Sequence, residues 1–221
     1  MPQNKQKNQN NIQFELLQMS PRFTNSVLVH DGDDCVIFDA WGRADDWLKL
    51  LGTRNLKLTA IYSTHGHPDH ISAAPDLVDD TGCKWFLNGL DFDLYAWGDD
   101  LLIQFGLPPM TRGIMPISLP ENPIQIFPNV NMQIIQMPGH TPGGVAFYFP
   151  DNKICLTGDS IFADGIGRTD LPGGDFTQLM QSISNFYNLN LPNDTVVVPG
   201  HGNITTVSEL KTINPWFKPN K

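Results

Sequence analysis

Four short apolar runs in this chain each end at a loop rich in glycine, histidine and aspartate. The runs are LTAIYS (58–63), MQIIQM (132–137), KICLT (153–157) and TVVV (195–198), and the loops after them are THGHPDH, PGHTPGG, GDS and PGHG. Apolar runs of this length, bounded by glycine and proline, are typical of buried strands. A sheet presents the ends of its strands together, so we expect the four loops to lie close to one another.

The rest of the chain alternates between strand-like and helix-like patterns. SVLVH (26–30) and CVIFD (35–39) flank turn residues and predict a hairpin, and further strands are expected at 84–87 and 145–149. The expected helices are 45–51 closed by Gly52, 70–81 ending at Gly82, and an apolar stripe that begins after Asp175 as N-cap. Residues 88–118 show no regular pattern. The aromatic residues of the overlapping segment from Trp85 to Phe105 are interpreted either as a lid over an acyl group or as core packing.

Length and composition favour one globular domain. The chain has 221 residues, and its first thirteen, MPQNKQKNQNNIQ, are mostly Asn and Gln. We therefore expect a flexible tail at 1–13 and a single domain at 14–221. The net charge is −9 and no basic run occurs, so no nucleic-acid partner is expected. No export or membrane-spanning segment is visible, which predicts a cytoplasmic protein without a membrane partner. The three cysteines are expected to be free thiols.

The loops hold a set of metal-binding side chains. Residues 64–70 contain three histidines and one aspartate, namely His65, His67, Asp69 and His70, and the later loops add His140, Asp159 and His201. Five of the six histidines fall in these loops, and only His30 is left over. Imidazole and carboxylate ligands suit zinc, and also iron or manganese. The pattern therefore predicts a metal site at the strand ends.

These motifs resemble a known family. THGHPDH resembles the H-x-H-x-D-H signature of the metallo-β-lactamase superfamily, and PGHTPGG, GDS and PGHG match the family's remaining ligand positions in order. The resemblance extends from about Ser26 to the C-terminus. It implies an α/β fold, an αββα sandwich of two packed mixed β-sheets with helices on the outer faces.

The resemblance also implies two divalent metal ions, with zinc expected and iron or manganese as alternatives. One would be bound by His65, His67 and His140, and the other by Asp69, His70 and His201. Asp159 would bridge them together with a hydroxide that attacks a carbonyl carbon. The catalytic residues implied are Asp159 and Asp69, which would orient the nucleophile or accept a proton.

The segment GDSIFADGIGRTDLPGGD (158–175) resembles the glyoxalase II (hydroxyacylglutathione hydrolase) branch of the family. That resemblance implies hydrolysis of a small-molecule thioester, such as S-lactoylglutathione, to a hydroxy acid and a free thiol. It also implies that Arg168 holds a carboxylate of the thiol, against the alternative of an ion pair with Asp164 or Asp170. Full-length glyoxalase II enzymes add a C-terminal helical region, whereas this chain stops about twenty residues after His201.

Other functions remain open on the sequence. A persulfide dioxygenase of the same fold would bind one iron and consume oxygen, and other hydrolases of the fold include lactonases, phosphodiesterases and β-lactamases. A non-catalytic metal-binding module would load metal without turning over any ester or thioester. The metal identity and the oligomeric state are not predicted.

Overall fold

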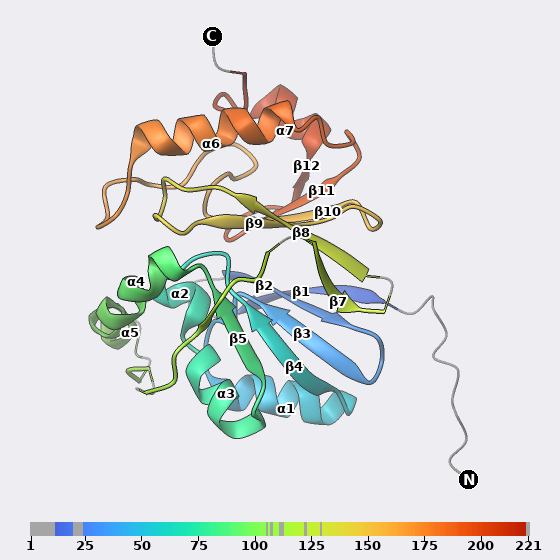
Figure 1. Cartoon of the computed structure of the whole chain (residues 1–221), viewed down its shortest axis with the longest axis vertical. Helices are drawn as coiled ribbons and strands as arrows, with labels where there is room; N and C mark the ends of the chain where they lie inside the picture. The colour runs from blue at the N-terminus through green and yellow to red at the C-terminus, as the bar shows by residue number, and fades with distance from the viewer. Residues whose placement is uncertain are drawn as a thin grey trace.

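The computed structural model describes residues 12–19, 24–104, 106, 108–110, 113–121, 123–128 and 130–219. Within these residues, two six-stranded sheets pack face to face, and helices cover the outer face of each sheet (Figure 1). The αββα sandwich implied by the family resemblance is confirmed.

The first sheet contains the N-terminal half of the chain. Its strands, in spatial order, are β1 (Gln13–Met19), β2 (Thr24–His30), β3 (Asp34–Phe38), β4 (Lys57–Tyr62), β5 (Lys84–Leu87) and β6 (Ile117–Ser118). The predicted hairpin is the antiparallel pair β2–β3, whereas β3 to β6 run parallel. Strand β1 was not predicted. It begins at Gln13, the last residue of the expected tail, whose residues 1–11 lie outside the described chain.

The second sheet contains the C-terminal half. Its strands, in spatial order, are β12 (Thr205–Thr206), β11 (Val196–Pro199), β10 (Ile154–Gly158), β9 (Val145–Phe149), β8 (Val130–Gln136) and β7 (Ile124–Phe127). Strands β10 and β11 are parallel and their neighbours are antiparallel. The four strands predicted here, β8 to β11, are confirmed within a few residues at each end.

The helices are α1 (Ala44–Arg54), α2 (Pro68–Ile71), α3 (Ala74–Thr81), α4 (Phe92–Trp97), α5 (Asp99–Gln104), α6 (Phe176–Asn188), α7 (Val207–Ile213) and the 3₁₀ helix η1 (Gly89–Asp91). The predicted stop at Gly52 is wrong, because α1 continues to a left-handed Asn55 (φ 55°). The helix expected at 70–81 is divided into α2 and α3, but α3 ends at Gly82 as predicted. Helix α6 begins after Asp175, whose side chain accepts the Gln178 N–H as expected.

The prediction of an irregular segment at 88–118 is also wrong, because η1, α4, α5 and β6 lie within it. Helices of six residues leave almost no periodic signal and depend on tertiary packing. Tyr95 and Leu102 supply that packing, since both are buried against the first sheet. Trp85 is buried too and meets Tyr95 edge to face at 5.5 Å, so these two aromatic residues pack the core and form no lid. The Trp97 side chain and Phe105 lie outside the described part.

Three hydrophobic cores hold the layers together. Alternating side chains of β2 explain why that strand is buried on both faces: Val27 and Val29 point between the sheets, whereas Leu28 points toward α1 and α3. Phe147 on β9 meets Phe38 on β3 between the sheets at 5.2 Å. The third core lies between the second sheet and helices α6 and α7. The cysteines are free and buried, as expected.

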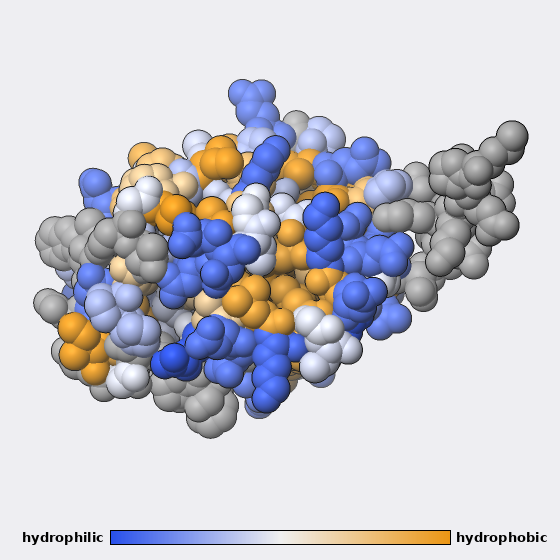
Figure 2. Space-filling model, turned by 90° about the horizontal axis from the view of Figure 1, so that it is seen from below, coloured by the Kyte–Doolittle hydropathy of each residue, from blue (hydrophilic) through white to orange (hydrophobic). Residues whose placement is uncertain are grey.

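The outer helical face of the first sheet is largely hydrophilic. Figure 2 shows the molecule from this side, with hydrophilic residues around a central area of apolar surface. Partly buried leucines such as Leu17, Leu48 and Leu50 pack against the core beneath α1. Among the described residues, none of the helices has the length and apolar character that crossing a bilayer requires.

Candidate metal centre

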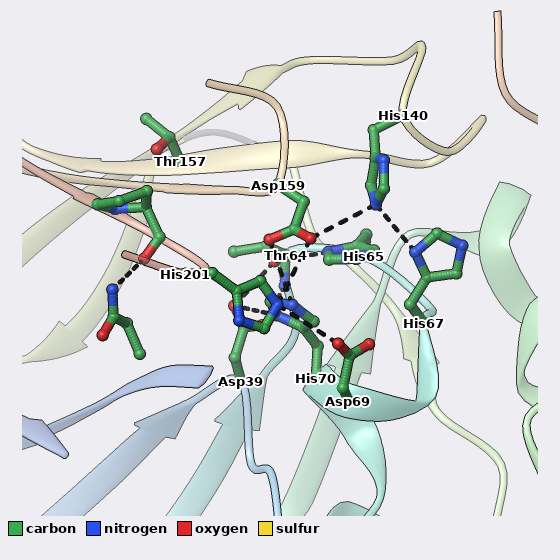
Figure 3. Close-up of polar contacts among 12 residues, drawn as sticks. Asp39, Thr64, His65, His67, Asp69, His70, His140, Thr157, Asp159 and His201 are labelled. Carbon is green, nitrogen blue, oxygen red and sulfur yellow. Dashed lines mark hydrogen bonds and ion pairs between the residues drawn. The ribbon is translucent and has the colours of Figure 1, made fainter. Parts of the chain in front are cut away.

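The seven predicted ligands converge at the carboxyl ends of β4, β8, β10 and β11, where the two sheets meet (Figure 3). Their donor atoms form three overlapping groups, each within 4.8 Å, and these are His65–His67–His140, His65–His70–Asp159 and Asp69–His70–His201. The prediction that four separate loops meet in one place is therefore confirmed. The first and third groups are also the two triads that the family resemblance implies.

The first triad is oriented by a backbone carbonyl. Nδ1 of His140 lies 2.7 Å from the carbonyl oxygen of Arg168, which can only accept, so Nδ1 carries the proton. Nε2 of a neutral His140 then presents its lone pair to the centre, where it lies 2.9 Å from Nδ1 of His67. Two ring nitrogens that face each other at this separation suit a shared metal ion.

His65 completes this triad, and its orientation is set by Thr64 and Asp39. The Thr64 hydroxyl donates to Asp39 Oδ2 at 2.8 Å, so its oxygen accepts from His65 Nδ1 at 3.0 Å. Nε2 of His65 then carries a lone pair toward the centre. That atom is buried and has no hydrogen-bond partner among the described residues.

The second triad faces the first across Asp159. His70 is fully buried, with Nδ1 3.0 Å from Asp39 Oδ2 and Nε2 3.4 Å from Asp159 Oδ1. Nε2 of His201 lies 3.3 Å from Asp69 Oδ2 and 3.6 Å from Asp159 Oδ2. The second oxygen of Asp159 also lies 3.7 Å from His140 Nε2. One carboxylate therefore contacts histidines of both triads, as a bridging ligand must.

Burial and mutual charge shape the protonation of the donors. Burial, with the neighbouring His140, lowers the pKa of His67 to about 4, and burial beside His70 lowers the pKa of His65 further. For Asp159, burial raises the pKa, but His70 and the other histidines outweigh it and lower the pKa overall. Neutral imidazoles and ionised carboxylates are the forms that bind metals, so these shifts suit His65, His67 and Asp159. For His70, burial lowers the pKa, but Asp39 and Asp159 outweigh it and raise the pKa, so a metal ion would have to displace its proton.

The donor set fits two divalent metal ions on the evidence of its unsatisfied atoms. His65 Nε2, His70 Nε2 and Asp159 Oδ1 are buried without a hydrogen-bond partner among the described residues. Buried polar atoms normally find partners, and these three all face the same centre. The set of histidines and carboxylates matches the ligands of zinc and iron.

Asp39 supports the centre and was not predicted as a site residue. It follows β3 in a left-handed conformation (φ 54°), which aspartate tolerates better than most residues. Its carboxylate accepts the Thr64 N–H at 2.7 Å and the Thr64 hydroxyl at 2.8 Å, and it faces His70 Nδ1. An aspartate directly after a buried strand was the only local signal available.

Asp91 is a second support that the sequence did not reveal. The side chain is fully buried and accepts three hydrogen bonds, from the Gly66 N–H at 2.9 Å, the Thr141 hydroxyl at 2.7 Å and the Gly143 N–H at 2.6 Å. It therefore ties the loop of His65 and His67 to the loop of His140. A Cβ on Gly66 or Gly143 would lie within 2.7 Å of Asp91, which explains why both positions are glycine.

The loop of His201 is held from the other sheet. The Asn25 side chain on β2 donates to the carbonyls of Pro199 at 2.9 Å and Gly202 at 3.0 Å, and its N–H donates to Gly200 O at 2.7 Å. A Cβ on Gly200 would lie 2.1 Å from Asp159 Oδ1, so the backbone reaches the centre only as glycine.

Arg168, the predicted substrate-binding residue, lies beside the centre with an exposed side chain. Its guanidinium forms two hydrogen bonds with Asp170, at 2.7 and 2.8 Å, while its carbonyl oxygen holds His140. The structure thus shows the ion pair with Asp170, one of the two alternatives weighed from the sequence. A cavity of about 560 Å³ opens next to His201.

Comparison with known proteins agrees with this geometry. The family model of the metallo-beta-lactamase superfamily matches residues 19–201. Hydroxyacylglutathione hydrolase GloC of Haemophilus influenzae is 32% identical over 214 residues, which cover 93% of this chain and 98% of that relative.

Two solved structures are similar over nearly their whole length. BLEG-1 B3 metallo-beta-lactamase has a TM-score of 0.81 and 31% identity, covering 93% of this chain and 99% of its own. TTHA1623 in a di-iron-bound form has a TM-score of 0.81 and 33% identity, covering 91% of this chain and 99% of its own.

Proposed function

The chain belongs to the metallo-beta-lactamase superfamily, and we propose that this metal-dependent hydrolase cleaves a thioester such as S-lactoylglutathione to a hydroxy acid and a free thiol. The observation that carries the proposal is the set of seven converging donors with Asp159 between its two triads. The similarity to a hydroxyacylglutathione hydrolase over almost the whole of both chains supports the substrate class.

The first triad would hold one metal ion and the second triad the other, with Asp159 shared. When bound, two divalent ions would lower the pKa of a shared water and polarise a substrate carbonyl. We propose zinc in both positions. Iron is the alternative, because the similar TTHA1623 has been solved in a di-iron-bound form. Elemental analysis of protein purified without chelator should approach two equivalents of metal per chain, and one firm equivalent would contradict the binuclear assignment.

The protein's own residues orient the reaction and handle the proton. Burial raises the pKa of Asp69, but His201 and His70 lower it overall, so Asp69 stays ionised at neutral pH. A carboxylate in that state can accept a hydrogen bond from the attacking water and orient it, although its lowered pKa disfavours holding the proton. The departing thiolate is a stable anion, so no strong protein acid is required. Asp39, through Thr64 and His70, keeps the donor nitrogens pointed inward.

Turnover of S-lactoylglutathione by protein of measured metal content tests the proposal directly. We expect release of free thiol, detected with a chromogenic disulfide, in proportion to bound metal. The matched oxygen ester should be hydrolysed more slowly, because an alkoxide leaves less readily than a thiolate. Absence of thiol release from fully loaded protein would contradict the thioester assignment. Oxygen consumption with glutathione persulfide would instead indicate the dioxygenase chemistry that the sequence left open.

Hydrolysis of β-lactams is a second candidate, favoured by the similarity to BLEG-1 over nearly the full length of both chains. An amide nitrogen leaves less readily than a thiolate, so hydrolysis of a β-lactam requires more stabilisation of the leaving group by the site. A chromogenic cephalosporin offered to the same metal-loaded preparation distinguishes the two. We expect a much lower kcat/KM for the cephalosporin than for the thioester, and the reverse order would favour the lactamase.

A further inference from the structure

A cavity next to His201 is a feature of the site that metal binding by the seven ligands leaves unexplained. It is lined by Phe162, Ala163, Asp164, His201, Gly202, Asn203 and Ile213. Its volume of about 560 Å³ lies within the range of roughly 300–1,000 Å³ that is usual for small-molecule sites. A small hydroxyacyl group would fill only a fraction of this space, so the cavity fits the larger half of a thioester, its thiol carrier.

Hydrogen bonds fix the conformation of the cavity wall. The turn at 162–165 closes on itself through the Phe162 N–H and Gly165 O at 2.9 Å. The buried side chain of Asn214 then donates to both the Phe162 and the Gly165 carbonyls, at 2.8 Å each. The Trp216 N–H donates to Asn214 Oδ1 at 2.8 Å, so the segment after α7 holds the turn in place.

The chemistry of the wall is apolar with one negative charge. Phe162, Ala163 and Ile213 contribute apolar surface, and Ile213 is 59% exposed. Asp164 is exposed, and no lysine or arginine of the described chain forms an ion pair with it. Arg168, at the other end of the same loop, already has its guanidinium paired with Asp170.

We infer that this cavity binds the thiol carrier of the substrate and that Asp164 selects a carrier with a cationic group, such as a free ammonium. The inference rests on the proposed function and adds the orientation of the substrate at the same centre. The carrier lies on the His201 side, its apolar part against Phe162 and Ile213 and its cation near Asp164. An unpaired carboxylate on an apolar wall attracts a cation and repels an anion.

Three thioesters with the same acetyl group test this inference on the metal-loaded enzyme. Acetylthiocholine carries a permanent positive charge, S-(3,3-dimethylbutyl) thioacetate is its uncharged isostere, and S-acetyl-3-mercaptopropionate carries a negative charge. We expect kcat/KM to fall in that order at low ionic strength, with about a threefold to tenfold preference for the cationic over the neutral compound, because Asp164 is exposed. Added salt should shrink the preference.

Variants assign the preference to Asp164. Asp164→Asn should lower the cationic-to-neutral ratio by about threefold to tenfold from its wild-type value, and Asp164→Lys should shift the preference toward the anionic thioester. The control Asp151→Asn makes the same charge change in the exposed turn at the far end of β10 and should keep the wild-type ratio. Equal kcat/KM for the cationic and neutral thioesters, or an unchanged ratio in Asp164→Asn, would overturn the inference while leaving the thioester hydrolase intact. No turnover of any thioester would contradict both this inference and the proposed thioester hydrolase function.

Discussion

The loops that carry the metal ligands and the loop that carries Arg168 and Asp164 lie side by side, but they are held very differently. The ligand loops are buried and tied together by carboxylates from other elements, since Asp39 holds Thr64 and His70, and Asp91 joins Gly66 to Gly143. The side chains of Arg168 and Asp164 are exposed, and among the residues that the structure describes Arg168 forms an ion pair only with its close neighbour Asp170.

This difference separates two tasks. Metal ligands must keep their donor atoms aimed at the metal positions, which requires surrounding groups that hold each ring and carboxylate. Contacts with the outer part of a substrate can sit on exposed side chains, because they need only add binding energy. Changes in the ligand region should therefore affect metal binding and turnover together, whereas changes in the outer loop should affect substrate preference.

Asp159→Asn should have the largest effect, because it removes the charge shared by the two triads while keeping the shape. We expect turnover to fall by on the order of a thousandfold or more, with metal content below two equivalents. Elemental analysis and thioester turnover measure both, and Asp151→Asn serves as the control. Wild-type activity and stoichiometry in Asp159→Asn would show that the two regions do not differ as described.

Asp91→Asn should come next, because the new amide would point an N–H at the N–H of Gly66 or Gly143. Loss of these buried hydrogen bonds should lower the free energy of unfolding by about 2–4 kcal/mol. The metal of the His65–His67–His140 triad should be removed first by a graded chelator, since Asp91 joins its two loops.

Asp39→Asn is the matched comparison, because Asp39 faces His70 of the other triad as well as Thr64. We expect that variant to weaken both metals rather than one. If Asp91→Asn and Asp39→Asn lose metal in the same pattern, the proposal that Asp91 supports one triad and Asp39 supports both is wrong.

Asn214→Ala should have an intermediate effect, confined to the cavity wall. Loss of its two hydrogen bonds to the 162–165 turn should lower the free energy of unfolding by about 1–3 kcal/mol. Metal content should remain at the wild-type value, and KM for the thioester should rise. The control is Asn185→Ala, which removes an exposed asparagine of α6. It should leave the free energy of unfolding, the metal content and KM close to their wild-type values. Loss of metal in Asn214→Ala would show that the wall and the centre are one unit.

Arg168→Ala should have the smallest effect. If the guanidinium also holds a carboxylate of the substrate, KM should rise by about threefold to tenfold with little change in kcat. Arg168→Lys should recover only part of the loss, because an ammonium cannot donate in a fork. Arg43→Ala, which removes another exposed arginine paired with an aspartate two residues on, is the control. A fall in kcat without a rise in KM would indicate that the Arg168–Asp170 pair helps to hold the loop whose backbone carbonyl contacts His140.

The sequence alone was enough to predict strands β2 to β5 and β8 to β11 and the place where the seven candidate donors meet, but not strands β1, β6, β7 and β12. Short apolar runs followed by glycine, histidine and aspartate are local signals, because both the strand pattern and the metal-binding side chains can be recognised from residues adjacent in the sequence. The helix capped by Asp175 was predicted for the same reason. Where local signals were weak, as in the short helices α4 and α5, the prediction of an irregular segment failed.

Only the tertiary structure decided what supports the ligands. Asp91 lies in the segment predicted to be irregular, and its partners Gly66 and Thr141 are 25 and 50 residues away along the chain. Asn25 holds the loop of His201 from a strand 174 residues earlier. No local pattern marks a carboxylate or an amide for such a role. The hydrogen-bond partners of Asp91 and Asn25 become their neighbours only when the two sheets pack. The burial that strengthens these hydrogen bonds arises at the same step.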